Sequence, residues 1–237
     1  DRKFPEFSLT KLLHSVFDPT EGCRICIITD FEEPSQEIRG FEFLQSPEKF
    51  AVQVKAYEEF FCKLKDGVMK ELGMSGGEMF AYHATNGSNL DMKDECFGVD
   101  GSVLSLDQNI YPEYDIILCI SDWSATAPLT AKCKDFGFRG ATMHGLNDII
   151  LNSGLSVDYN QVSSDAEKLR LAMTGADEIE IDFTLDEGKT LTAKLFLDGQ
   201  EAQKSHGLCR GKAPDIANLP AGEVYFVPVD AVGQFPM

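Results

Sequence analysis

The sequence of 237 residues has no run of about 18 or more uncharged apolar residues, which a membrane-spanning helix requires. Its first residues, DRKFP, also lack the apolar segment of a secretory signal peptide. Both absences argue against a membrane as a partner, and we expect a cytoplasmic location. The apolar content of 43% is nevertheless enough for one large or two small packed cores.

Basic residues are scarce. The sequence has 21 Lys and Arg against 39 Asp and Glu, which gives a formal net charge of -18. A protein with this excess of negative charge repels the phosphate backbone of nucleic acids and anionic lipid surfaces. We therefore expect no nucleic acid among its partners.

The cysteines lack the even number and regular spacing of a disulfide framework. Seven are scattered along the chain, which suggests reduced thiols in a reducing compartment. Cys23 and Cys26 form a C-x-x-C pair, but the pair runs directly into the sequence IIT at residues 27–29, so both thiols are expected in a strand. A zinc ribbon would need a second pair, which is absent.

Glycine-rich phosphate-binding motifs are also missing. Residues 75–78, SGGE, match neither G-x-G-x-x-G nor G-x-x-x-x-G-K-[ST], and they predict a turn. The sequence has no internal repeat and no low-complexity segment.

What the first part of the chain does have is strands alternating with helices. This order implies an α/β fold with a parallel or mostly parallel sheet flanked by helices on both faces. We place this N-terminal domain at residues 1–157. The expected helices are residues 9–17, 47–72, a segment capped by Ser124 or Thr126 that runs to 136, and 146–151; the expected strands are 23–29, 79–85, 114–121 and 140–145.

The pattern changes after residue 157. A helix is expected at residues 159–173, followed by strands at 179–185 and 190–197 with the hairpin turn DEGK between them. A helix followed by successive antiparallel strands departs from the α/β alternation. We therefore predict that a second, partial α+β domain occupies residues 158–237.

Residues 218–228, NLPAGEVYFVP, carry the most specific pattern in the sequence. Pro and Gly before Glu223 favour a tight turn, and residues 224–227 have the β-branched and aromatic character of a strand closed by Pro228. A carboxylate mounted on a rigid turn at the mouth of a strand suits a metal ligand or a general base. The plainer alternative is that Glu223 caps an exposed turn.

These eleven residues resemble the N-L-P-x-G-E-V-(aromatic)-x-x-P signature of the M29 metalloaminopeptidases, the group of aminopeptidase T, aminopeptidase S and related leucyl aminopeptidase-like enzymes. Upstream, the sequence ADEIEI at residues 176–181 and the turn DEGK resemble the segment by which that family reaches its signature. The resemblance covers about residues 115–237, and the first hundred residues are similar only in pattern.

The resemblance implies that Glu223 is a ligand of a site with two divalent ions, which are zinc, cobalt or manganese. Such a site activates a water molecule that attacks a peptide substrate with a free N-terminus. It also implies a homodimer. In the family the other ligands, which are a second glutamate, histidines and an aspartate, lie downstream of the signature, whereas this sequence ends at Met237. We therefore expect the isolated chain to have no peptidase activity.

Two alternatives stay open. Mononuclear iron dioxygenases of the same superfamily open hydroxypyridine rings, and they would need a different set of downstream ligands. A non-catalytic binding or assembly module on the same scaffold would need none.

Four further residues are weaker candidates. Asp30 follows a buried strand at its carboxyl end, where open α/β sheets bind ligands, but an aspartate that turns the chain is the better explanation. His83 falls within a strand and His144 at a strand end, and a structural role is favoured for both. His206 lies in the glycine-rich loop SHGLCRGK, either beside Glu223 or simply on the loop.

Overall fold

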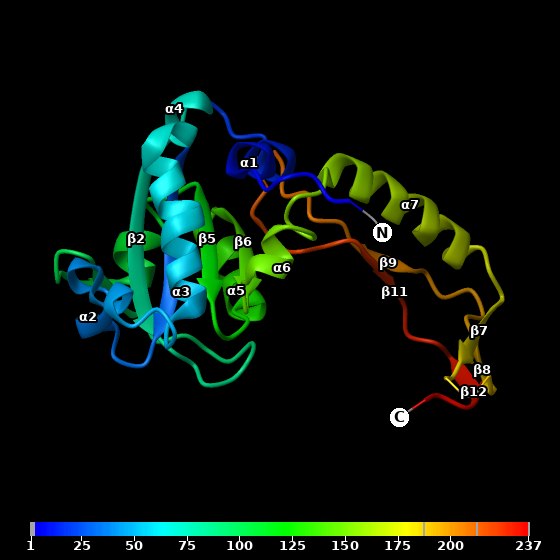
Figure 1. Cartoon of the computed structure of the whole chain (residues 1–237). Coiled ribbons are helices and arrows are strands. Elements are labelled where there is room, and N and C mark those ends of the chain that lie inside the picture. The colour runs from blue at the N-terminus through cyan, green and yellow to red at the C-terminus, as the bar shows by residue number, and fades with distance from the viewer. Residues whose placement is uncertain (1–2, 187, 212, 237) are drawn as a thin grey trace. The chain divides into compact units, whose positions relative to one another are not determined.

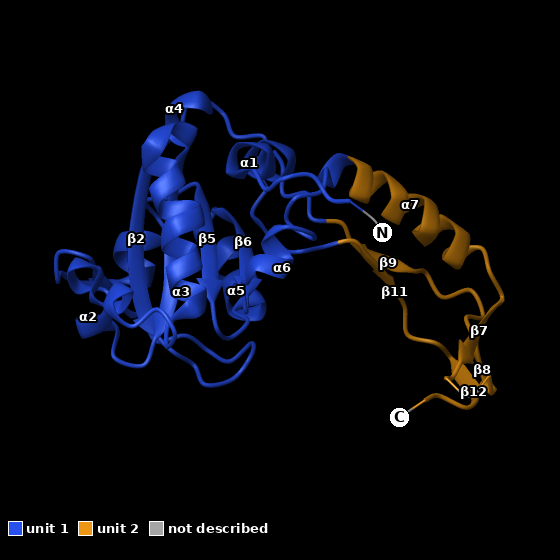
Figure 2. Cartoon of the chain, in the orientation of Figure 1, with its two compact units in different colours: residues 1–160, 207–221 blue, residues 161–206, 222–237 orange. Residues whose placement is uncertain are grey.

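The computed structural model describes residues 3–186, 188–211 and 213–236 (Figure 1). The chain forms two compact units (Figure 2). Unit 1 consists of residues 1–160 and 207–221, and unit 2 of residues 161–206 and 222–237. Among the described residues, every helix is too short or too polar to span a bilayer.

Unit 1 is built on a seven-stranded sheet with the strand order β10-β6-β5-β1-β2-β3-β4. The first five strands in this order run parallel, and β3 and β4 extend the sheet in antiparallel fashion. The predicted α/β class with a mostly parallel sheet is therefore confirmed. The strands are β1 (Arg24–Phe31), β2 (Ser75–His83), β3 (Glu95–Gly98), β4 (Val103–Ser105), β5 (Ile116–Ser121), β6 (Arg139–His144) and β10 (Asp215–Asn218).

Helices lie against the sheet of unit 1 (Figure 1). The helix α1 begins after Ser8, whose hydroxyl accepts a hydrogen bond from the Lys11 N–H, and it has the predicted bounds. The predicted long helix is helical over residues 51–71, with π-helical turns and a kink at Gly67, where φ is 139°. The helical segments are α1 (Leu9–Phe17), α2 (Pro34–Glu37), η1 (Arg39–Gln45), α3 (Ala51–Lys55), η2 (Ala56–Cys62), η3 (Leu64–Val68), α4 (Met69–Glu71), η4 (Leu106–Ile110), α5 (Thr126–Phe136) and α6 (Asp148–Leu151).

The core of unit 1 surrounds strands that are covered on both faces. Every residue of β5, and all of β1 except Arg24, is buried, as expected for apolar strands between two helical layers. On one face, aromatic rings fill the space between strands and helices: Tyr111 stacks on Phe138 with ring centroids 5.1 Å apart. Burial of this kind is the main source of free energy for folding unit 1.

Three local predictions for unit 1 are wrong. Residues 75–78 do not form a turn but begin β2; Gly76 and Gly77 have positive φ, and the register with β1 shifts at this point, as in a β-bulge. Residues 31–47, whose polar composition and two prolines predict a loop, contain α2 and η1. Neither Ser124 nor Thr126 caps α5. The Asn89 side chain, far away in sequence, instead accepts a hydrogen bond from the Ala127 N–H at 2.9 Å.

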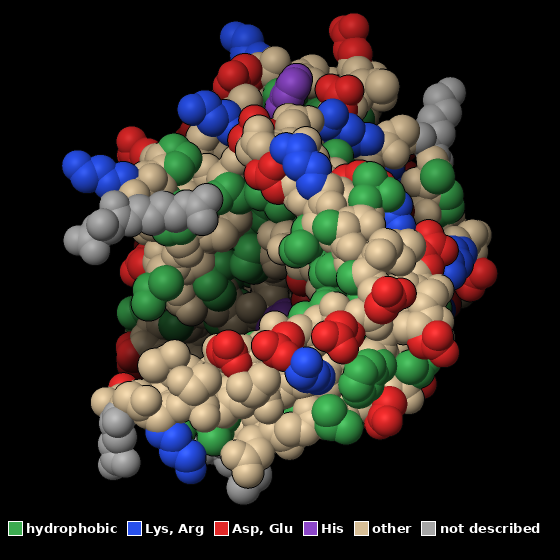
Figure 3. All heavy atoms as spheres, turned by 90° about the vertical axis from the view of Figure 1, so that its right-hand side faces the viewer, with side chains coloured by type: hydrophobic (Ala, Val, Ile, Leu, Met, Phe, Trp, Pro, Cys, Tyr) green, Lys and Arg blue, Asp and Glu red, His purple; other side chains and the backbone are tan. Residues whose placement is uncertain are grey.

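Unit 2 contains most of the helix α7 (Tyr159–Thr174) and two small antiparallel sheets. β7 (Glu178–Thr184) and β8 (Thr190–Phe196) form the predicted hairpin, whose turn includes residue 187, outside the described residues. β12 (Asp230–Gly233) pairs with β8, and β9 (Gln203–Ser205) pairs with β11 (Glu223–Tyr225). Apolar side chains reach the surface among acidic ones on the face where α7 and β12 lie (Figure 3).

The units divide the chain differently from the expected boundary at residue 157. The first break follows residue 160, and residues 207–221 return to unit 1, where β10 pairs with β6. The chain therefore returns from unit 2 to unit 1 within the loop expected at residues 205–212. Residue 212 lies outside the described residues. The four residues of β10, DIAN, carry no strand pattern, which is why their place in the first sheet was not foreseen.

Candidate functional site

The signature segment starts on the sheet of unit 1. β10 lies parallel to β6, with Ala217 opposite Ala141. The next residue after β10, Leu219, is buried and donates its N–H to the Thr142 carbonyl at 2.9 Å. The Leu219–Pro220 peptide bond is cis. The pairing with β6 therefore continues one residue past β10, to Leu219, and the chain bends after it.

Tyr159 holds the turn that follows. Its phenol donates to the Gly154 carbonyl at 2.9 Å and accepts from the Ala221 N–H at 3.4 Å. Its buried ring lies so close to Gly207 that a Cβ there would come within 2.4 Å of the ring. Burial raises the pKa of Tyr159 to about 12, so the phenol stays protonated. The backbone ahead of the glutamate is thus fixed by close packing, in line with its Pro and Gly content.

Glu223 is the first residue of β11, opposite Ser205 of β9. Gly222 precedes it with a φ of 125° and donates its N–H to the Ser205 carbonyl at 2.8 Å. Glu223 itself is exposed, and among the described residues its carboxylate has no hydrogen bond and no ion pair. The strand is shorter than the predicted one and begins at the glutamate itself.

The described residues do not complete a metal site around Glu223. No group of three or more His, Cys, Asp or Glu side chains in the described part of the chain is placed to hold a metal ion. A single carboxylate cannot compensate the dehydration of a divalent cation. The two-metal site that the resemblance implies, with Glu223 as one of its ligands, therefore stays a prediction.

The three candidate histidines lie on or next to separate elements. His83 ends β2, with Nε2 3.1 Å from the Glu95 carboxylate. His144 ends β6 and is exposed. His206 directly follows Ser205, the strand partner of Glu223, and is therefore next in sequence to the β9–β11 pair.

Asp30 has a structural role. It is 1% exposed and lies inside β1, where both carboxylate oxygens are used: they accept the N–H groups of Asp122 and Trp123, at 2.8 and 3.3 Å. The Gln53 amide donates to the same carboxylate at 3.1 Å. Desolvation raises the pKa of Asp30 to about 6, and the nearby Asp122 charge adds to this. Asp30 therefore ties the end of β5 to β1, at the point in the sheet where ligands commonly bind.

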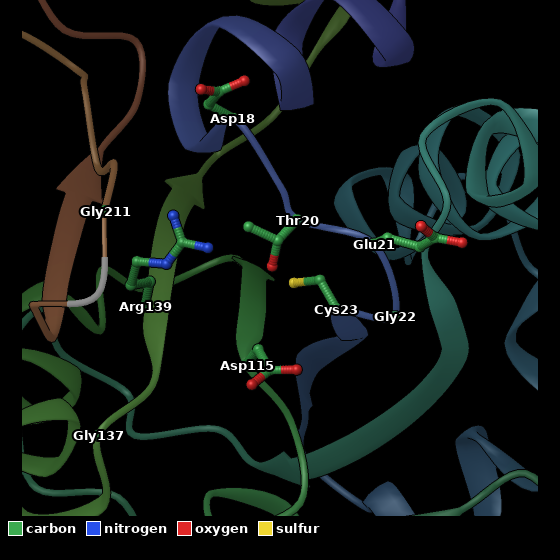
Figure 4. Close-up of a pocket in the computed structure, with 9 residues that line it drawn as sticks. All are labelled: Asp18, Thr20, Glu21, Gly22, Cys23, Asp115, Gly137, Arg139 and Gly211. Atoms are coloured by element: carbon green, nitrogen blue, oxygen red, sulfur yellow. The ribbon is translucent and has the colours of Figure 1, made fainter.

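A pocket that the sequence did not indicate lies at the amino ends of the parallel strands β1, β5 and β6, opposite the strand ends near Asp30 (Figure 4). Its volume is about 670 Å³. The side chains around it are two buried ones, Cys23 and Arg139, and four exposed ones, Asp18, Thr20, Glu21 and Asp115. The glycines between them place backbone at the wall.

Arg139 is the central side chain of this pocket. It is 8% exposed, and its Nη1 donates to the carbonyls of Phe17 and Cys209 at 2.7 and 3.0 Å. Within the described residues no carboxylate lies at ion-pair distance from its guanidinium. Burial and the charge of Asp115 raise the pKa of the Cys23 thiol to about 11, although Arg139 acts in the opposite direction. The thiol beside the guanidinium is therefore neutral.

Comparison with known proteins adds no relative to these observations. No family model matches the chain, and neither do the curated proteins or the solved structures. The resemblance to the M29 metalloaminopeptidases thus depends on the residues of the signature and the segment before it.

Proposed function

We propose that this chain supplies the scaffold and one metal-binding carboxylate, Glu223, of a metal-dependent aminopeptidase. In this proposal unit 1 fixes the base of the signature, and Glu223 provides anionic oxygen to a pair of divalent ions. Because the described residues form no group of three or more metal-ligating side chains, we expect no peptide hydrolysis by the chain alone.

One observation carries the proposal: the base of the signature is fixed, while its carboxylate is left exposed and unpaired. A glutamate that merely caps a turn accepts hydrogen bonds from nearby backbone N–H groups. Within the described residues, Glu223 accepts none, whereas Leu219 and Ala221 just before it are both hydrogen-bonded. A ligand needs this combination, since its support must be rigid and its oxygen atoms must remain available.

Calorimetric titration with zinc, cobalt or manganese tests the proposal. We expect no saturable binding to this chain, and binding to a version extended at its carboxyl end by a segment that carries the remaining ligands. Glu223→Gln should abolish or strongly weaken that binding, because it replaces a charged ligand with a neutral amide. Glu48→Gln, which changes another exposed glutamate, serves as the matched control and should have no effect.

Activity gives a second readout. Chelator-sensitive release of an N-terminal residue from an aminoacyl anilide is expected only in the longer form. Cleavage by the present chain that survives purification and disappears with chelator would show that the described residues do more than we propose. Ring cleavage that depends on iron(II) would favour the dioxygenase, and metal binding by neither form would favour a non-catalytic module.

A further inference from the structure

The pocket at the amino ends of β1, β5 and β6 carries opposite charges at its base and at its mouth. Arg139 lies buried at the base, whereas Asp18, Glu21 and Asp115 are exposed around the opening. We propose that this pocket binds a small zwitterion such as a free α-amino acid, with the carboxylate on Arg139 and the ammonium group on Asp115.

The guanidinium of Arg139 calls for an anionic partner. A guanidinium group has five N–H donors. Those of Arg139 make two bonds to backbone carbonyls, both from Nη1, and one hydrogen bond to the neutral Cys23 thiol, so no anion is among these partners. Figure 4 shows the group turned into the pocket, toward Thr20 and Cys23. A buried cation without a counter-charge is costly, and a carboxylate is the group that matches a guanidinium in both charge and shape.

The mouth of the pocket selects against a purely anionic ligand. Three carboxylates surround the opening, so a dianion such as phosphate would be repelled as it approached Arg139. A purely cationic ligand would leave the buried guanidinium unmatched. A molecule with one charge of each sign, a few bonds apart, satisfies both ends of the pocket.

Asp115 is the carboxylate best fixed to receive the ammonium group. It lies just before β5, and its Oδ2 accepts the Arg24 backbone N–H at 2.7 Å, which orients the side chain. Asp18 and Glu21 belong to the loop between α1 and β1 on the other side of the opening (Figure 4).

The size of the pocket agrees with a small ligand. A volume of about 670 Å³ lies within the range of roughly 300–1,000 Å³ that small-molecule sites occupy. All the residues of the pocket belong to unit 1, so this proposal does not depend on Glu223 or on the proposed peptidase.

Calorimetry at low ionic strength with the present chain tests the proposal. The probes are glycine, L-alanine and L-leucine, with acetate, methylammonium and inorganic phosphate as molecules that carry a single kind of charge. We expect saturable binding of at least one amino acid, at least tenfold tighter than that of any singly charged probe or phosphate. Failure of all three amino acids to bind, or tighter binding of phosphate, would overturn the proposal.

Two variants locate the ligand. Asp115→Asn keeps an oxygen that accepts the Arg24 N–H but removes the charge, and Arg139→Lys keeps the charge but removes the paired donors. Each should weaken amino-acid binding about tenfold, the effect of losing one charge-assisted hydrogen bond. Glu113→Gln, which changes an exposed carboxylate paired with Arg24, is the matched control and should bind as the parent does. Unchanged binding in a folded Asp115→Asn variant would refute the assignment even if Arg139→Lys does not fold.

Discussion

The two units differ most in how they bury apolar side chains. Unit 1 encloses whole strands between helices, whereas the described part of unit 2 buries only four apolar residues, Ala166, Ala193, Leu197 and Ala202. Larger apolar side chains of unit 2 are exposed: Leu169, Leu171, Tyr225, Val227, Val229, Val232 and Phe235. The hydrophobic effect, which scales with apolar area removed from water, thus stabilises unit 1 far more than unit 2.

Unit 2 depends instead on backbone ladders and surface ion pairs. Arg170 pairs with Glu167 at 2.9 Å and with Glu201 at 3.2 Å, and Lys204 pairs with Glu167 at 2.8 Å. Ion pairs of this kind contribute little each, because water and salt screen them. The comparison teaches that a regular backbone can form in a region whose side chains supply little of the free energy for folding.

Removal of a phenylalanine ring from each unit should show the largest difference. Phe60 is fully buried in unit 1, and Phe183 is half-buried in unit 2, where its ring centroid lies 5.8 Å from that of Phe235. Phe60→Ala should lower the free energy of unfolding by about 3–5 kcal/mol, the usual cost of a large cavity. Phe183→Ala should cost about 1 kcal/mol or less.

Denaturant unfolding measures both. The single tryptophan, Trp123, belongs to unit 1, so its fluorescence follows that unit, while circular dichroism follows both. An equal loss of unfolding free energy in the two variants would show that unit 2 also has a well-packed apolar core, and would contradict the comparison.

Two arginines offer the next largest contrast. Arg139→Gln removes the buried guanidinium that donates to two backbone carbonyls, and it should cost about 3 kcal/mol in unit 1. Arg170→Gln removes ion pairs of unit 2 with solvent-accessible glutamates, and it should cost much less than Arg139→Gln. Thermal unfolding of both variants checks the difference, and a larger loss for Arg170→Gln would contradict it.

Acid should act on the two units in opposite directions. The pKa of Asp30 is raised to about 6, so the folded form of unit 1 holds this proton more strongly than the unfolded chain does. The contribution of Asp30 to stability is therefore present at low pH and is lost as the pH rises through about 6. From pH 4 to pH 7 the loss should be about 2 kcal/mol. Asp30→Asn should remove this dependence, and the exposed Asp91→Asn should retain it.

Glu167 has the opposite sign. Hydrogen bonds from Arg170 and then Lys204 lower its pKa to about 2, so its contribution to unit 2 is present above the unfolded pKa and is lost as the pH falls toward 2. Because the group is exposed, the effect should be small. Denaturant unfolding at pH 7 and pH 3 measures both effects. A shift of the midpoint in the same direction for both units would contradict the predicted opposite response to acid.

Salt should produce the smallest effect. Lys204→Gln removes one exposed partner of Glu167 and should lower the free energy of unfolding of unit 2 by about 0.5 kcal/mol. Addition of 1 M sodium chloride to the parent should have a similar effect on unit 2 and almost none on the buried core of unit 1. Hydrogen exchange of the β9 amides measures both changes. A variant that exchanges at the parent rate would show that the pair contributes nothing.

The sequence predicted secondary structure best where buried residues follow one another in a continuous or regular pattern. The apolar runs of β1 and β5 and the one-sided pattern of α1 predicted these elements because both faces of the strands, and one face of the helix, are covered. The short strands β3, β4 and β10 at the two ends of the strand order were missed, since three or four residues are too few for a period to appear. The bulge at Gly76 and Gly77 has the composition of a turn, and only its pairing with β1 shows it to be strand.

The candidate sites were foreseen unevenly for a related reason. The rigid turn before Glu223 follows from its own Pro and Gly, but Tyr159, which holds it, lies far away in the sequence. The pocket was invisible because Asp18, Asp115 and Arg139 meet only when β1, β5 and β6 take their places in the sheet. The order of strands in a sheet depends on the whole fold, so it cannot be predicted from the pattern of any one segment.

The late return of residues 207–221 to the first sheet affects the protein during its synthesis. β6 emerges from the ribosome long before β10, its neighbour at the edge, so its outer backbone groups stay unpaired until residue 218 appears. At roughly 5–20 residues per second this lasts several seconds, during which the open edge of β6 is exposed to pairing with another nascent chain.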